Sequence, residues 1–392
     1  MAWNEIVGQE RAKDILRKSL ERNRLAQAYL FSGPEGSGTE ALSIELAKSL
    51  NCAARKPGTA DACNRCDECR RFETLQHPNL HLIFALPAGK NETAGDRPMD
   101  KLTREQIEFI QQAIAEKARN RYFVISVPKA SEIRVNSIRD IRRIASLSAG
   151  TGGKKVFVIL EADRLNDESS NTLLKTLEEP LGDTVLILTT ADPDALLPTI
   201  ISRCQQIRLS RLSEGQIASA LVSNHNVDAG KAEAIAVLVN GNYSLAIELL
   251  GVDITAYRLQ AVDFLRTVLY KSRREVYDAI RALVEANDRK DLEQLLNLLN
   301  TWFRDAMLLS RGIDRRLPVE EEAVIRKFNA AHSNVDFGEI QTVIDEAISH
   351  LAKNAYIPLL LAVLAMRLRK LMLPTRQTVP IRPTILIDSE HH

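Results

Sequence analysis

Four of the five cysteines lie close together near the start of the chain. They are Cys52, Cys63, Cys66 and Cys69, with the spacing C-x10-C-x2-C-x2-C. Four thiolates can surround one zinc ion tetrahedrally, and a site whose positions are all filled by the protein is structural. An iron–sulfur cluster is the alternative, because C-x2-C-x2-C also occurs in ferredoxins, but the C-x3-C-P ending of that run is missing. The spacing therefore favours structural zinc.

Three further residues of metal-ligand type do not extend this site. Cys204 follows an apolar stretch and is predicted to be a packed thiol. His77 and His81 lie near the cluster, but four sulfurs already complete a tetrahedral site. Both are predicted to be ordinary surface or core histidines.

A glycine-rich loop has the frame of a phosphate-binding loop without its chemistry. Residues 33–40 read GPEGSGTE, with Gly33, Gly36 and Gly38 between an apolar run and a helical pattern, the context of G-x-x-x-x-G-K-[ST]. Thr39 stands at the position of the lysine that contacts the β- and γ-phosphates, and Glu40 at that of the magnesium-binding hydroxyl. An anion there repels phosphate and suits the helix dipole, so Glu40 is expected to cap the loop itself. We expect no tightly bound ATP.

The apolar run Val156–Leu160 ends without its expected aspartate. Nucleotide hydrolases carry an acidic pair at such a strand end to bind magnesium and position water. Here Leu160 stands at the aspartate position and Glu161 is retained, while Asp163 lies beyond the strand end and is interpreted as a turn residue. A second nucleotide motif is thus altered at its chemical position, which argues against intrinsic ATPase activity.

The first half of the chain alternates apolar runs with helical periodicity. Continuous apolar runs, typical of strands buried in a parallel sheet, cover 28–32, 156–160 and 184–189, and a further strand is predicted at 123–127. Helical patterns cover 9–22, 41–50, 135–147 and 169–178. This alternation predicts a doubly wound α/β domain over residues 1–210. The cysteine module, residues 51–70, is inserted into it, and the polar stretch 88–100 is expected to be an exposed insertion.

From residue 212 onward no strand is predicted. Three short helical patterns cover 214–223, 229–239 and 244–250, and residues 256–370 are helical throughout. We expect a small helical region at 211–253, a larger helical domain at 254–372 and a loosely held tail at 373–392.

The composition excludes several classes of protein. The chain has 52 Lys and Arg against 51 Asp and Glu, so it carries no excess of positive charge that would indicate a nucleic-acid partner. The longest apolar run, 356–366, contains Pro358 and falls well short of the ~20 residues that span a bilayer. The first residues lack a signal-peptide pattern. We expect a soluble cytoplasmic protein with no membrane partner, in which clustered cysteines bind metal rather than form disulfides.

Four short motifs in the first half of the chain are specific in combination. They are IVGQE at 6–10, AYLFSG at 28–33, LLKTLEEP at 173–180 and SRC at 202–204. In this order, and together with the cysteine module, they resemble the clamp-loader subunits of bacterial DNA polymerase III, of the AAA+ class. The resemblance covers about residues 1–210. It implies an AAA+ core, zinc in the cysteine module, a helical lid at 211–253 and a collar for oligomerisation at 254–372.

Within that family, subunits of the gamma/tau type keep the loop lysine, the aspartate and a sensor-2 arginine. Here Thr39, Leu160 and Ser244 stand at those three positions, so the chain is similar to subunits of the delta prime type. The Ser-Arg-Cys triplet survives. The resemblance implies that Arg203 is an arginine finger, which stabilises charge on the γ-phosphoryl oxygens of ATP bound by a neighbouring subunit. Pairing of Arg203 with a carboxylate of its own chain is the alternative.

The resemblance also implies the partners: gamma/tau and delta subunits, the sliding clamp through weak or indirect contact, and primer–template DNA inside the complex. Candidates for DNA contact are Arg134, Arg139, Arg142, Arg143, Lys154 and Lys155, which equally suit a solvated helix face. Two other functions stay open. One is an active gamma/tau-like ATPase with an atypical loop, and the other is a zinc-dependent DNA-binding protein.

Overall fold

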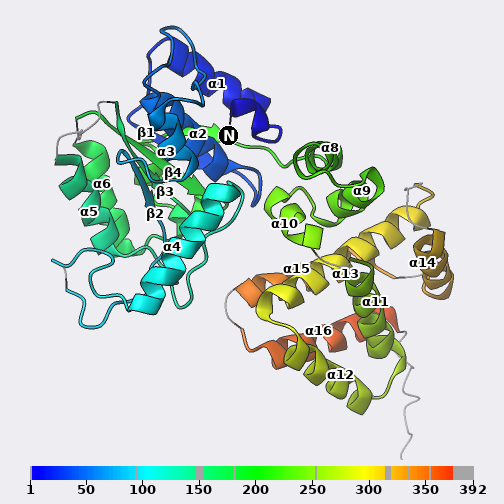
Figure 1. Cartoon of the computed structure of the whole chain (residues 1–392). Coiled ribbons are helices and arrows are strands. Elements are labelled where there is room, and N and C mark those ends of the chain that lie inside the picture. The colour runs from blue at the N-terminus through cyan, green and yellow to red at the C-terminus, as the bar shows by residue number, and fades with distance from the viewer. Residues whose placement is uncertain are drawn as a thin grey trace, which may run out of the picture. The chain divides into compact units, whose positions relative to one another are not determined.

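The computed structural model divides into two compact units, residues 1–252 and 253–392 (Figure 1). The structure describes residues 2–93, 95–146, 153–179, 182–251, 254–313, 319–333, 335–352 and 355–373. Residues 147, 180 and the tail from 374 therefore lie outside the described part, although the sequence predictions reach them.

Unit 1 is built on a five-stranded parallel sheet with the order β2-β3-β4-β1-β5. The strands are β1 (Ala28–Ser32), β2 (Leu80–Ile83), β3 (Lys155–Ile159), β4 (Thr184–Thr190) and β5 (Gln205–Arg208). Every residue of β1, β3 and β4 is buried, as continuous apolar runs predict, because these strands lie in the middle of the sheet. In the edge strand β5 only Ile207 is buried, so its apolar signal is weak.

Helices cover both faces of this sheet (Figure 1). The helices of unit 1 are α1 (Glu10–Glu21), α2 (Thr39–Asn51), α3 (Asp67–Glu73), α4 (Arg104–Arg119), α5 (Val135–Ser146), α6 (Asp167–Glu178), α7 (Pro198–Ile201), α8 (Glu214–His225), α9 (Ala229–Leu238) and α10 (Tyr243–Glu248). The apolar stripes of α5, α6 and α7 pack on Phe157, Ile159, Leu186 and Leu188. Helix α2 contacts β1, β3 and β4. The predicted doubly wound α/β class is confirmed.

Residues 123–127 are not a strand, so that prediction was wrong. Their side chains do alternate, with Ile125 and Val127 buried and Val124 and Ser126 exposed. A strand also needs ladder hydrogen bonds, and the carbonyl of Phe123 instead accepts one from Lys117 Nζ at 2.6 Å. Alternation alone therefore misled the prediction.

The described residues of the polar stretch 88–100 are mostly exposed, as predicted, and one of them anchors the stretch to the domain. Glu92 has a buried side chain that forms an ion pair with Arg134 and accepts a hydrogen bond from Asn136 Nδ2 at 2.7 Å. Both partners lie at the start of α5 or just before it. One buried carboxylate thus fixes this segment.

Unit 2 is helical, as predicted. Its helices are α11 (Ile254–Tyr270), α12 (Arg273–Ala286), α13 (Arg289–Ser310), α14 (Val319–Ala331), α15 (Phe337–Ala352) and α16 (Ile357–Met372). Helix α13 contacts α11, α14 and α15, and its Trp302 and Phe303 pack edge-on against Phe328. Among the described residues no helix has both the length and the apolar character needed to cross a membrane.

Candidate functional site: the altered phosphate loop, Arg203 and the cysteine cluster

The glycine loop joins β1 to α2 with the backbone turn that its sequence predicts. Gly36 and Gly38 have φ angles of +68° and +99°, in the left-handed region that glycine adopts without strain. The Ser37 N–H donates to the carbonyl of Pro34 at 3.1 Å, and the Gly33 N–H donates to Thr190 at 3.2 Å. Two amides of the loop are therefore used within the protein.

Side chains of the protein itself crowd this loop. A β-carbon on Gly36 would lie 1.9 Å from Asn242 Oδ1, and one on Gly38 would lie 3.1 Å from the Tyr122 hydroxyl. The Gln9 amide donates to the Ser37 carbonyl at 3.1 Å. Segments before α1, after α4 and before α10 thus all close on the glycine loop.

Helix α10 begins directly against the loop. The Tyr243 N–H donates to the Gly36 carbonyl at 3.3 Å, and the Tyr243 ring packs edge-on against Tyr122 at 4.7 Å. The Tyr122 hydroxyl in turn accepts from the Val7 N–H at 2.9 Å, and burial raises the Tyr122 pKa. Ser244, at the position of the expected arginine, is buried and brings no positive charge.

Glu40 does not cap the loop, so that expectation was wrong. Its carboxylate forms an ion pair with Lys117 of α4. Lys117 is completely buried and also donates to the carbonyls of Phe123 and Arg121. The anion at the magnesium-ligand position is thus neutralised from within the protein.

Sequence reasoning missed Lys117, although a signal was available. The buried residues of α4 are Ile110, Ala113 and Lys117, at spacings of three and four residues. This is the apolar face of an amphipathic helix. A lysine on such a face needs a buried acceptor, because an unpaired buried charge is costly. The sequence offered no means of choosing Glu40 as that acceptor.

The acidic strand end lies close to the same loop. Leu160 is buried directly after β3, and Glu161 has a left-handed backbone with φ +49°. Burial is the main cause that raises the pKa of the Glu161 carboxyl to about 7, with the charge of Arg164 opposing the rise and the nearby carboxylates of Glu40, Asp163 and Glu35 adding to it. Asp163 accepts from the Thr190 hydroxyl at 2.5 Å. Several carboxylates therefore lie near the glycine loop, and two of them are paired, Glu40 with Lys117 and Glu161 with Arg164.

Arg203 lies between α7 and β5, at the surface. Its Nη2 atom is 2.7 Å from Glu178 Oε1, and its Nη1 atom donates to the Thr199 carbonyl at 2.9 Å. The side chain is 38% exposed and that of Glu178 is 51% exposed. Arg203 thus has a carboxylate partner within its own chain and still reaches solvent.

The four clustered cysteines converge on one point. Their sulfur atoms all lie within 4.8 Å of one another, with Cys52 to Cys66 at 4.0 Å and Cys63 to Cys69 at 3.9 Å. In a tetrahedral zinc site with Zn–S bonds of about 2.3 Å, two sulfur atoms lie about 3.8 Å apart. An iron–sulfur cluster divides its cysteine thiolates among two or more iron atoms, so their sulfur atoms lie further apart. The geometry fits one metal ion.

The electrostatics of the sulfurs differ across the cluster. The backbone N–H of Arg65 is the main cause that lowers the Cys63 pKa to about 6, whereas burial raises the pKa of Cys52 and of Cys69. Burial also raises the pKa of the separate Cys204 thiol to about 12.

The two nearby histidines pack against aromatic rings. His77 stacks on Phe72 with ring centroids 4.3 Å apart. His81 stacks on Phe157 at 4.7 Å.

Ion pairs and hydrogen bonds tie the cysteine module to the rest of unit 1. Arg121 Nη2 donates to the carbonyls of Phe72 and Glu73 at 2.8 and 3.0 Å. Lys48 of α2 is buried, lies 2.9 Å from Glu45 and donates to Asn64 Oδ1 at 2.5 Å. The module is therefore held by α2 and by the segment that follows α4.

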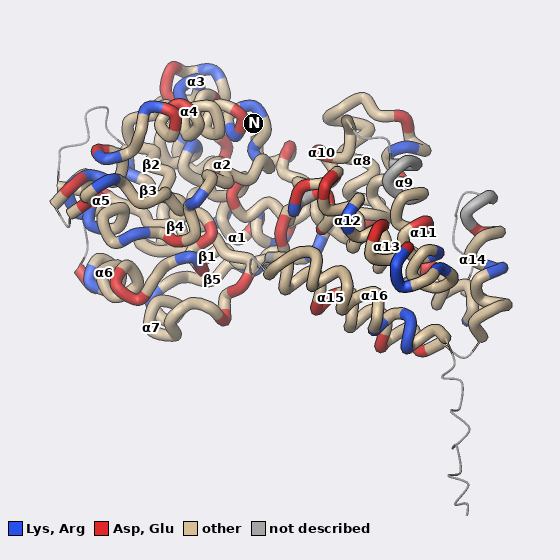
Figure 2. Tube along the Cα trace, turned by 90° about the horizontal axis from the view of Figure 1, so that it is seen from below, with Lys and Arg blue, Asp and Glu red and all other residues tan. Residues whose placement is uncertain are grey.

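The basic residues around α5 are compensated. Figure 2 shows positive and negative residues interspersed around α5 and α6. The arginine pairs are Arg134–Glu92, Arg139–Glu168, Arg142–Glu179 and Arg143–Asp140. Lys154 pairs with Asp183, and Lys155 donates to the carbonyl of Ile144. Because five of the six pair with carboxylates and Lys155 is buried, these residues do not form an uncompensated basic patch.

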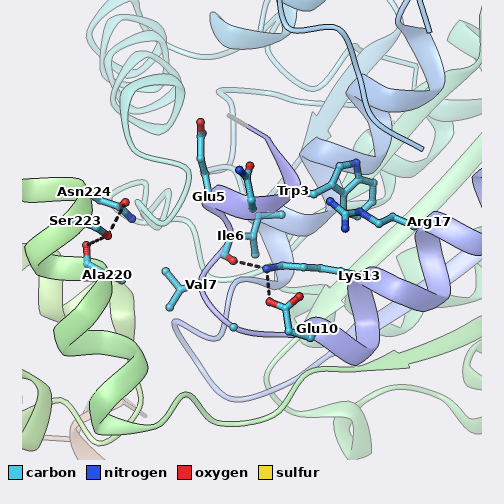
Figure 3. A pocket seen from close by; sticks show the side chains of 12 residues that line it. Trp3, Glu5, Ile6, Val7, Glu10, Lys13, Arg17, Ala220, Ser223 and Asn224 are labelled. Carbon is cyan, nitrogen blue, oxygen red and sulfur yellow. Dashed lines mark hydrogen bonds and ion pairs between the residues drawn. The ribbon is translucent and has the colours of Figure 1, made fainter. Parts of the chain in front are cut away.

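A cavity of about 240 Å³ lies beside the N-terminal segment rather than over the glycine loop (Figure 3). Trp3, Val7 and Arg17 line one part of it, and Ala220 and Asn224 of α8 line another. Lys13 on its wall donates to the Ile6 carbonyl at 2.6 Å and to Glu10 at 2.9 Å. Lys13, one of the two cations that line this cavity, is therefore already engaged.

Residues 8–213 match the family described as DNA polymerase III, delta subunit. The chain belongs to this family. It is 28% identical to DNA polymerase III subunit delta' of Bacillus subtilis, over 81% of this chain and 83% of that protein. It is 26% identical to the tau subunit of the same organism, over 81% of this chain but only 53% of that protein. A solved gamma-subunit-related protein from Thermotoga maritima covers 93% of this chain and is itself wholly covered, at 15% identity and a TM-score of 0.42. Family membership confirms the resemblance that the motifs indicate.

Proposed function

We propose that this chain is a non-hydrolysing, delta prime-type subunit of the replicative clamp loader, within the DNA polymerase III holoenzyme. The observation that carries the proposal is the glycine loop, which is closed by Asn242, Tyr122 and Gln9 and has the Glu40–Lys117 ion pair at its magnesium-ligand position. A nucleotide at this loop would gain no lysine at position 39, and its magnesium would gain no hydroxyl at position 40.

The charges around the loop support the same conclusion. Glu35 and Asp163 lie near Glu161, and Lys117 is already paired with Glu40, so its charge is not free to offset the repulsion between these carboxylates and a phosphate. A triphosphate brings several more negative charges into this region. Without the loop lysine and a strand-end aspartate, magnesium and phosphate lose two of the groups that usually hold them. We therefore expect neither tight ATP binding nor hydrolysis by this chain alone.

Titration of the isolated chain with a fluorescent ATP analogue and magnesium tests this first part. We expect no saturable binding at micromolar concentrations. Magnesium-dependent micromolar binding that disappears in Gly38→Ala, with the variant shown to be folded, would support the gamma/tau-like ATPase instead. Tight binding of duplex DNA by the isolated chain, lost on metal chelation, would favour a zinc-dependent DNA-binding protein.

The second part of the proposal concerns Arg203. Its guanidinium is exposed and follows α7, in the family's Ser-Arg-Cys triplet. We assign it the role of a finger that acts on ATP bound by a neighbouring gamma/tau-type subunit. Such a group stabilises the charge that spreads over the γ-phosphoryl oxygens during transfer. The chain would thus contribute to hydrolysis at a site that it does not contain.

At saturating concentrations of the subunits, Arg203→Ala is expected to leave assembly intact and to lower the DNA-stimulated ATPase rate of a reconstituted clamp loader. Turnover at the one ATP site that Arg203 serves should fall about 10³-fold, the lower end of the range for arginine fingers. The total ATPase rate of the complex should therefore fall by the part that this site contributes. Arg208→Ala is the matched control, because Arg208 is an exposed arginine of the adjacent strand β5. An unchanged rate in Arg203→Ala would remove the finger.

The remaining parts of the proposal concern the metal and the partners. The four cysteines would hold structural zinc, since they fill all four positions of a tetrahedral site. Unit 2 would serve as the collar that contacts gamma/tau and delta subunits. Helix α16 and the residue before it expose Tyr356, Leu359, Val363 and Met366 at spacings of three and four, a stripe suited to packing against another helix. The complex would hold primer–template DNA and load the sliding clamp in the cytoplasm, with weak or indirect clamp contact by this chain.

A further inference from the structure

We propose that Glu178 restrains Arg203 in cis until a phosphate on a neighbouring subunit replaces it. Glu178 is then a positioning residue that acts through the arginine. The inference rests on the proposed function, because it supposes that Arg203 serves a neighbouring ATP site. It adds a second residue and a condition under which the arginine becomes available.

The geometry places two anchors on one guanidinium. Glu178 is the last residue of α6, and its Oε1 atom is 2.7 Å from Arg203 Nη2. The carbonyl of Thr199 accepts from Nη1 at 2.9 Å. Each terminal nitrogen of the guanidinium is therefore held by an oxygen of its own chain.

A carboxylate at this distance opposes the action of a finger. The finger works by bringing positive charge to the γ-phosphoryl oxygens. Glu178 cancels much of that charge while the pair is closed, and it would bring a negative charge close to the phosphate if the pair docked intact. The arginine therefore has its full effect only after it leaves Glu178.

The pair is weak enough to open. Both side chains reach solvent. An exposed ion pair favours its closed form over its open form by at most about fivefold. A γ-phosphate carries more negative charge than a carboxylate and competes well for the guanidinium. The pair should thus stay closed beside a neighbour without a γ-phosphate and open beside one that has it.

This exchange predicts how a variant without the carboxylate behaves. A closed pair lowers the fraction of molecules whose arginine is available. The apparent affinity of the subunit for its neighbour falls in proportion to that fraction. In Glu178→Gln that restraint is removed. The subunit concentration that gives the half-maximal DNA-stimulated ATPase rate of the reconstituted complex should fall about two- to fivefold. The maximal rate per complex should not change.

Two controls isolate the arginine as the route. Glu179→Gln removes the adjacent exposed carboxylate, whose partner is Arg142, and should behave like the wild type. In the Arg203→Ala background Glu178→Gln should have no effect, because residues that act through one contact are not additive. Glu178→Ala repeats the test with a different side chain. Thermal unfolding of each variant checks that the fold is intact.

The outcomes separate the two proposals. A half-maximal concentration that is unchanged or higher in both Glu178 variants, or a lower maximal rate, would overturn the restraint and leave the finger in place if Arg203→Ala still lowers the rate. No change in Arg203→Ala would overturn the finger, and the restraint with it. A gain of the same size in Glu179→Gln would show that charge at the end of α6, rather than the Glu178–Arg203 pair, is responsible and would also overturn the restraint.

Discussion

Lys117→Met is expected to lower the free energy of unfolding of unit 1 by about 3–5 kcal/mol, the usual cost of removing one partner of a buried ion pair. The ammonium has no exposed surface and serves the Glu40 carboxylate and two backbone carbonyls. Methionine fills similar space but donates no hydrogen bond. The variant therefore leaves a largely buried carboxylate and two carbonyls without their donor.

Urea unfolding can measure this in unit 1 alone. The chain has two tryptophans, Trp3 in unit 1 and Trp302 in unit 2. In a Trp302→Phe background the tryptophan fluorescence follows unit 1. Arg119→Met is the matched control, because Arg119 is an exposed cation of the same helix and its loss should cost about 0.5 kcal/mol or less.

A double variant distinguishes the ion pair from simple packing. Glu40→Gln in the Lys117→Met background removes the stranded charge, and replacing both members of a buried pair is often close to neutral. We expect it to recover more than half of the lost stability. If it recovers nothing, the role of Lys117 is to fill space and serve the carbonyls, and Glu40 is not its essential partner.

Cys69→Ser should abolish stoichiometric zinc binding. Cys69 has no exposed surface and supplies one of the four clustered sulfur atoms. Structural zinc contributes on the order of 10 kcal/mol or more to the folding of small modules, so its loss should unfold residues 51–70. Elemental analysis should give one zinc per chain in the wild type and well under one in the variant.

Cys204→Ala is the control for this experiment. Cys204 is buried apart from the cluster, so the variant should keep one zinc and four metal-protected thiols. Chelation of the wild type should make the four clustered thiols reactive while leaving Cys204 protected. Iron with inorganic sulfide in the purified protein, or full zinc content in Cys69→Ser, would contradict the assignment.

The elements that the sequence predicted well are those with a strong local pattern. The continuous apolar runs of β1, β3 and β4 identified central strands, because strands buried on both faces carry no polar alternation. Edge elements were harder. Strand β5 buries only Ile207, and residues 123–127 alternate like a strand without joining the sheet. At an edge, the pairing depends on neighbours that a local window does not contain.

The sequence alone determined those features of the chemistry that depend only on which residue stands at a motif position. The proposed loss of nucleotide chemistry rests on the residue types Thr39, Glu40 and Leu160 at three motif positions, and the cysteine spacing already suits one metal ion. Only the tertiary structure brings Lys117 to Glu40, Glu178 to Arg203 and Asn242 to Gly36. These contacts join residues far apart in the chain. Their partners are selected by the packing of helices on the sheet, which no spacing along the sequence encodes.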